Sequence, residues 1–166
     1  EKIREVILKD YFFHDPNEKF SKYTHTLLYL ASRNEHIENK IIPAISKGKI
    51  VLCDRFTDST LAYQVYGKGV SKTLVDSIHK YILGNVKPDL TIILDINLDE
   101  AFRRKNSSTP DRMESTGIDF FIRVQKGYYN IASQYADRCV IIDGNRQAEI
   151  VFESVCKEIN NKILRK

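Results

Sequence analysis

The stretch from Asp54 to Gln64 concentrates side chains that could bind an anion and recognise a polar ligand. Arg55 offers a planar guanidinium whose paired donors suit a phosphate, and Asp54 offers a carboxylate that can hold a hydrated metal ion or a water. Ser59, Tyr63 and Gln64 add donors and acceptors of the kind that recognise a base or a sugar. The alternative from the residues alone is structural, with Arg55 in a local ion pair with Asp54 or Asp58.

Three short apolar runs, each rich in β-branched residues, predict the strands that position this stretch. They span 49–54, 89–95 and 138–143, and they end in Asp54, Asp95 and Asp143. In an open parallel sheet, ligands bind beyond the carboxyl ends of the strands, so these aspartates are expected at one functional edge. A lone aspartate at a strand end also commonly caps the following turn, and that interpretation stays open for each of them.

Segments with helical periodicity lie around the predicted strands. They span about 18–47, 71–84, 97–105, 115–137 and 147–165, with a further amphipathic helix at 1–5. Gly48, Gly84 and Gly144 stand where helices or strands are expected to stop, and Ser71 is a predicted N-cap. Strands alternating with helices predict one α/β domain over 1–166, with a parallel sheet covered on both faces.

Composition narrows the class of protein. The chain has 166 residues, of which 42% are hydrophobic and 29% charged, as in a single globular domain. Its net charge of +4 favours anionic partners without selecting among nucleic acid, nucleotide and membrane surface. The apolar runs are far shorter than a membrane span, so no membrane partner is expected.

The cysteines and histidines favour neither a disulfide scaffold nor a zinc site. Cys53, Cys139 and Cys156 are odd in number and lack zinc-finger spacing, which favours a reducing cytoplasm. The four histidines do not pair at metal-binding spacing, so no protein-held zinc is expected. His36 is expected to face solvent.

The residues DRFTDSTLAYQ at 54–64 resemble the signature of bacterial thymidylate kinases. The helix residues Leu27–Arg33 resemble the family's helix in which an aromatic residue stacks on thymine and an arginine reaches a base carbonyl. Tyr29 and Arg33 are four residues apart and therefore share a helical face. Taken alone, Tyr29 is more typical of a core residue and Arg33 of a solvated charge.

The resemblance covers almost the whole chain. It continues through Lys87-Pro88-Asp89, Asp111-Arg112-Met113-Glu114, Phe120 with Arg123-Val124, and Ile142-Asp143-Gly144. It implies a three-layer α/β fold, the P-loop nucleoside-monophosphate kinase fold, with a parallel sheet flanked by helices.

The same resemblance implies phosphorylation of dTMP to dTDP with Mg-ATP, for dTTP synthesis. Arg55 inherits the contact with the dTMP phosphate, and Asp54 would help to place Mg²⁺ or orient the acceptor phosphate. Ser59 and Gln64 would hold the base edge, and Tyr63 would crowd the 2′ position of the sugar. The ATP contacts fall to Arg103, Arg104 and Asp143. The family also implies a homodimer formed through the helices near Tyr29.

One departure from the family concerns the phosphate-binding loop, G-x-x-x-x-G-K-[ST], which the sequence does not match. The nearest stretch, 67–73, has the wrong spacing and follows no predicted strand. We therefore expect a preceding strand, loop and helix, so that 1–166 is a kinase domain without its N-terminal strand and phosphate loop.

A second departure lies in the segment 103–116, whose basic and polar residues suit a lid over ATP. The family's catalytic lid arginine has its place at Ser107 or Ser108 here. Arg103, Arg104 or Arg112 would then supply the charge for the transition state. The alternative for 103–105 is an ordinary charged helix end.

Two other functions remain open at this point. A deoxynucleoside kinase has a related strand end but accepts a neutral 5′-hydroxyl, and the Ala62-Tyr63-Gln64 sequence argues against it. A non-catalytic nucleotide-binding or nucleic-acid-binding domain is the other alternative. Because the aromatic residues do not alternate with Lys and Arg along a strand face, no nucleic acid partner is expected.

Overall fold

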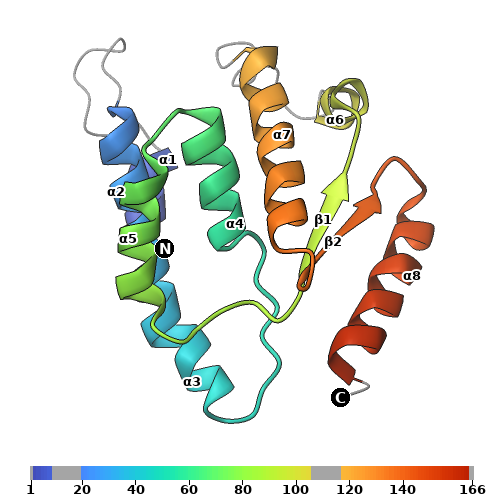
Figure 1. Ribbon diagram of the computed structural model, residues 1–166, viewed down its shortest axis with the longest axis horizontal. Coiled ribbons are helices and arrows are strands. Elements are labelled where there is room, and N and C mark those ends of the chain that lie inside the picture. The colour runs from blue at the N-terminus through green and yellow to red at the C-terminus, as the bar shows by residue number, and fades with distance from the viewer. Residues whose placement is uncertain (1, 9–19, 106–116, 165–166) are drawn as a thin grey trace. The chain divides into compact units, whose positions relative to one another are not determined.

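The computed structural model describes residues 2–8, 20–105 and 117–164. They form two compact units, 1–87 and 88–166, which are coloured blue to green and green to red in Figure 1. No helix in the described ranges is long and apolar enough to cross a membrane.

Among the described residues of the first unit, every element of regular secondary structure is a helix. These are α1 (Lys2–Leu8), α2 (Lys22–His36), the π-helical segment η1 (Ile37–Ile41), α3 (Ile42–Ile45), α4 (Thr57–Thr60), the π-helical segment η2 (Leu61–Gly67) and α5 (Lys72–Leu83). Two serine caps begin its longer helices, because the Oγ of Ser21 accepts from Thr24 N at 3.1 Å and that of Ser71 from Leu74 N at 3.4 Å. The predicted helices at 1–5, 18–47 and 71–84 are confirmed where the structure describes them, as is the Ser71 cap, whereas α4 and η2 were not predicted.

The core of this unit consists of aliphatic side chains that face one another across the helices. α2 packs against α1 and α5, and α5 packs against η2. The buried side chains include Leu30, Ile37, Ile41, Leu61, Ala62, Val70 and Val75. This packing brings the segment 57–67 against the helix that carries Tyr29 and Arg33.

The prediction of a strand at 49–54 is wrong. These residues have no regular secondary structure, and Ile50 and Leu52 are 66% and 85% exposed. A strand exists only where its backbone groups pair with a neighbour, and this segment has no strand partner among the described residues. The apolar run at 49–54 therefore leads into α4 without forming a strand.

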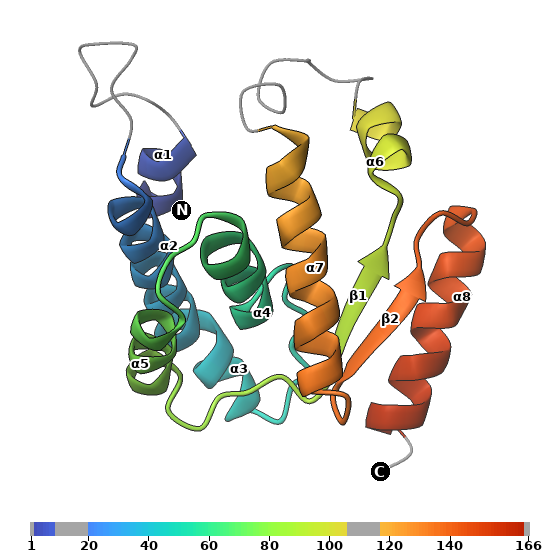
Figure 2. The ribbon, with the colours of Figure 1, turned by 45° about the horizontal axis from the view of Figure 1, so that its top comes forward.

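The second unit contains a pair of parallel strands, β1 (Thr91–Asp95) and β2 (Cys139–Asp143). Its helices are α6 (Leu98–Lys105), α7 (Ile118–Gln134) and α8 (Ala148–Ile159), followed by the π-helical segment η3 (Asn160–Leu164). Both α7 and α8 pack against β2, and Figure 2 shows them on either side of the strand pair. The strands predicted at 89–95 and 138–143 and the three helices are confirmed where the structure describes them.

The register of the two strands places their terminal aspartates side by side. Thr91 lies opposite Cys139, and Asp95 lies opposite Asp143. Gly144 then turns the chain so closely over β1 that its N–H donates to the carbonyl of Asp95 at 2.6 Å. A Cβ at this position would lie 3.0 Å from the same oxygen. The glycine stop predicted after the second of these strands therefore has a steric reason.

Candidate functional site

The first unit holds Arg55 in an unusual backbone conformation. Its φ is 63°, and it is the one residue other than glycine with a positive φ in the part of the chain that the structure describes. Such a conformation costs of the order of 1 kcal/mol and, where it occurs, often marks a functional position. The exposed guanidinium lies over the ring of Tyr63, 4.2 Å from its centroid. The structure thus stacks Arg55 on Tyr63.

Arg33 projects from α2 toward α4 in the same unit. Its Nη2 donates to the Oγ1 of Thr60 at 2.9 Å, and its Cζ lies 5.0 Å from the centroid of the Phe56 ring. Burial lowers the pKa of Arg33 to about 10, although Cys53 and Asp58 act in the opposite direction. The guanidinium is therefore charged at neutral pH but held in a largely enclosed polar setting.

The segment formed by α4 and η2 buries polar side chains that a simple core would not contain. Asp58 is 4%, Thr60 2% and Gln64 6% exposed, while Ser59 and Tyr63 are half-buried. Buried polar groups are retained where they have partners or a role. Because Gln64 is enclosed to this degree, a ligand would reach only the small part of its side chain that remains open.

Tyr29 lies half-buried on α2, one turn before Arg33. Its ring meets that of His25 edge to face, with centroids 4.9 Å apart. His25 in turn lies with its Nδ1 3.0 Å from the Nζ of Lys68, which follows η2. Tyr29, the residue predicted to stack on the base, therefore packs against the imidazole of His25.

Two histidines of this unit have a pKa well below the ordinary value of 6.5. Burial, followed by the charge of Lys68, lowers the pKa of His25 to about 4. Burial, followed by the charge of Arg33, lowers the pKa of His79 to about 4, against the opposite effect of Asp76 and Asp58. Both imidazoles are neutral at pH 7. His36, in contrast, is exposed as expected.

The low pKa of His79 predicts that the protein loses stability in mild acid. Between about pH 6.5 and 4 the unfolded chain binds a proton at this residue that the folded chain does not, so the free energy of unfolding falls as the pH falls. The expected contribution of His79 is about 3 kcal/mol across that range. Urea unfolding at pH 7, 5.5 and 4.5 measures it. His79→Gln should remove the part of this fall that His79 contributes and leave the part due to His25, while His36→Gln leaves the profile unchanged; equal profiles for His79→Gln and the parent would contradict the prediction.

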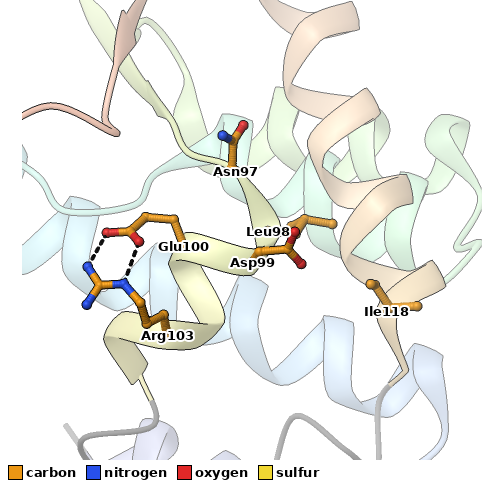
Figure 3. A pocket seen from close by; sticks show the side chains of 6 residues that line it. All are labelled: Asn97, Leu98, Asp99, Glu100, Arg103 and Ile118. Atoms are coloured by element: carbon orange, nitrogen blue, oxygen red, sulfur yellow. Dashed lines mark hydrogen bonds and ion pairs between the residues drawn. The ribbon is translucent and has the colours of Figure 1, made fainter.

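In the second unit, Glu100 on α6 joins two of the predicted lid arginines. Its carboxylate accepts from the Nε of Arg103 and from the Nε of Arg104, each at 2.7 Å, and from the Nη2 of Arg103 at 2.7 Å. These hydrogen bonds lower the pKa of Glu100 to about 2. Figure 3 shows the carboxylate of Glu100 and the guanidinium of Arg103 facing each other. Both residues line an open pocket of about 600 Å³.

Arg104 differs from Arg103 in its further contacts. Its Nη1 donates to the carbonyl of Gly144 at 3.1 Å and its Nη2 to that of Asn145 at 3.4 Å. The side chain of Arg103 is 73% exposed, against 45% for Arg104. Arg104 therefore anchors α6 to the turn after β2, whereas Arg103 is the arginine with more freedom to move. Arg112 lies outside the described residues.

Asp143 caps the turn that follows β2. Its Oδ1 accepts from the backbone N and the Nδ2 of Asn145 at 3.0 and 2.9 Å, and its Oδ2 accepts from the Nε of Arg146 at 3.1 Å. These bonds lower the pKa of Asp143. The capping interpretation left open by the sequence thus holds for Asp143. Asp95 beside it accepts from the Nε2 of Gln125 at 3.1 Å.

Sequence reasoning missed several partners of the predicted site residues. Phe56 and Thr60 lie in the signature stretch, but the sequence does not indicate that they contact Arg33. It also gives no role to His79. The sequence does contain a signal for the ion pairs of Glu100. It precedes Arg103 and Arg104 by three and four residues, which is the spacing of ion pairs on a helix. Asp76 is local to His79, but the sequence carries no signal for the nearness of Arg33 and Asp58, which come from other helices.

A parallel strand pair with helices packed against it makes the second unit an α/β fold. The thymidylate kinase family model matches residues 1–155. The thymidylate kinase of Kosmotoga olearia is 38% identical over 95% of this chain and 74% of its own length, and that of Bacillus velezensis is 35% identical over 98% and 76%. The crystal structure of the Ehrlichia chaffeensis thymidylate kinase superimposes with a TM-score of 0.71 at 30% identity, covering 95% of this chain and 71% of that one.

The chain belongs to the thymidylate kinase family. It is accordingly an enzyme of the phosphotransferase class, and the predicted α/β nucleoside-monophosphate kinase fold is confirmed.

Proposed function

We propose that this protein transfers the γ-phosphate of ATP to dTMP and so makes dTDP, the substrate of a later phosphorylation to dTTP. Membership of the thymidylate kinase family supports the activity. The observation that links this activity to a particular residue is the conformation of Arg55. This residue is exposed and has a φ of 63° within the family signature. Neither the deoxynucleoside kinase nor the nucleic-acid-binding alternative is favoured by that membership.

Phosphoryl transfer of this kind depends on positioning and charge neutralisation more than on covalent chemistry. The acceptor phosphate is the nucleophile and is already ionised, so the site needs no strong general base. Arg55 is suited to that phosphate because its exposed guanidinium presents paired donors. Tyr63 beneath it limits how far the guanidinium can turn. Ser59 and Gln64 are proposed for the base edge, and Tyr63 is also proposed to disfavour a 2′-hydroxyl.

The chain offers an exposed carboxylate of the kind that binds Mg²⁺ together with ATP. Mg²⁺ in kinases is bound by one or two carboxylates together with substrate phosphates, and Asp54 is an exposed carboxylate next to Arg55. Asp54 would hold the ion, which neutralises phosphate charge when bound. Arg103, Arg104 and Asp143 are proposed for the ATP side, with 103–116 as the lid and both units as parts of one kinase domain.

The base preference tests the proposed function directly. We expect dTMP to bind at least tenfold more tightly than dCMP, because Arg33 offers only donors, which suit a thymine carbonyl and oppose the amino group of cytosine. Calorimetric titration with both nucleotides measures this, and a coupled ADP-release assay measures turnover. Arg33→Ala should remove the preference, while Lys47→Ala, at an exposed position outside the proposed site, should keep it. Equal affinity of the parent for dTMP and dCMP would refute the assignment of Arg33.

A homodimer and a cytoplasmic location are further proposals. Tyr23 and Leu27 on α2 are 44% and 49% exposed, which supports a self-association surface along that helix. Sedimentation equilibrium would show a dimer that Leu27→Glu dissociates. The three cysteines, all within the described residues, are free thiols, as a reducing compartment requires.

A further inference from the structure

Two buried polar atoms of the first unit have no hydrogen-bond partner among the described residues. They are the Nε of Arg33 on α2 and the Nε2 of His79 on α5. His79 is only 7% exposed, so solvent does not satisfy it. Leaving a buried donor or acceptor unpaired costs about 1–3 kcal/mol, and such atoms call for a specific partner.

The two orphaned atoms belong to one polar cluster. α2 packs against α5, and Arg33 reaches Thr60 of α4. The charges of Arg33 and Asp58 both act on His79, and Asp58 also acts on Arg33. Arg33, Asp58, Thr60 and His79 therefore belong to one polar cluster that joins α2, α4 and α5.

The two atoms are also complementary. The Nε of Arg33 always carries a proton and can only donate. A neutral imidazole with its proton on Nδ1 presents a lone pair on Nε2, which can only accept. One buried water placed between them would accept from the arginine and donate to the histidine, as buried waters do between otherwise unsatisfied groups.

We propose that His79 is a positioning residue for Arg33, which it orients through one buried water shared by the Nε of Arg33 and the Nε2 of His79. With Nη2 held by Thr60 and the Phe56 ring beside the guanidinium, this third contact fixes the plane of Arg33. Nη1 is then left to donate to the base. The role rests on the proposed function, because it assumes that Arg33 recognises the base of dTMP.

Two variants and a double-mutant cycle test the role through binding. His79→Leu should weaken dTMP binding about tenfold and reduce the preference for dTMP over dCMP, whereas His79→Gln, whose amide reaches a similar position, should stay within about threefold. In an Arg33→Ala background, His79→Leu should have no further effect. His36→Leu, an exposed histidine, is the matched control. An equal loss from His79→Leu in both backgrounds, or no loss in the parent, would overturn the proposal.

A measurement on the unaltered protein does not depend on how the variants fold. Nitrogen-15 NMR of the histidine side chains at pH 7 should show His79 neutral, with its proton on Nδ1 and Nε2 as the acceptor. A proton on Nε2 would overturn the proposal. If the parent binds no dTMP at all, the proposed function fails, and the tautomer still decides whether the water-mediated contact is possible.

Discussion

Replacing Arg55 with alanine is expected to weaken dTMP binding by about 10- to 100-fold. A charge-assisted, bidentate contact with a phosphate contributes about 1.5–3 kcal/mol, and the guanidinium of Arg55 is exposed and oriented over Tyr63. Calorimetric titration with dTMP measures the change. Titration with thymidine, which lacks the phosphate, provides the internal comparison, because Arg55→Ala should leave that weaker binding almost unchanged.

The backbone of Arg55 supplies the controls for this prediction. At φ 63° glycine is unstrained, so Arg55→Gly should be about 1 kcal/mol more stable than Arg55→Ala while losing the same affinity for dTMP. Arg55→Lys keeps the charge but not the paired donors and should lose less affinity. If Arg55→Ala binds dTMP as tightly as the parent, the phosphate contact must be assigned to another residue.

Arg103→Ala is expected to lower turnover about 100-fold at saturating ATP and dTMP, while dTMP affinity stays within about threefold. Charge on the transferring phosphoryl group is greatest in the transition state, so a lid arginine contributes mainly there, and a 100-fold loss corresponds to about 2.7 kcal/mol. Arg103 is preferred over Arg104 because its side chain is 73% exposed and donates to Glu100 on its own helix, whereas Arg104 also donates to the turn after β2. Steady-state kinetics measure the effect.

Arg104→Ala is the matched control on the same helix. Because Arg104 donates to the carbonyls of Gly144 and Asn145, its loss should loosen the turn after β2 and lower the melting temperature with a smaller effect on turnover. A 100-fold loss in Arg104→Ala with an active Arg103→Ala would reverse the two roles. If both variants, and Arg112→Ala, retain turnover within a few-fold, then none of these three arginines supplies the transition-state charge.

The sequence alone determined much of the second unit and the chemistry of the first. The apolar, β-branched runs at 89–95 and 138–143 predicted the two strands, because such residues favour a buried parallel ladder wherever a partner exists. Ser71 predicted a helix start, since the hydroxyl that caps α5 is local to it. The stretch 54–64 predicted a family and a phosphate-binding arginine, because the signature is contiguous in the chain.

Only the tertiary structure decided which neighbours these residues have. The apolar run at 49–54 has the composition of a strand, but a strand depends on a partner that the run cannot specify by itself. The left-handed backbone of Arg55 is not implied by its residue type, which rarely adopts it. The cluster of Arg33, Thr60 and His79 joins three helices, so no local spacing reveals it. Contacts between distant segments depend on how the helices pack, and that packing is decided by the whole core at once rather than by any single stretch of sequence.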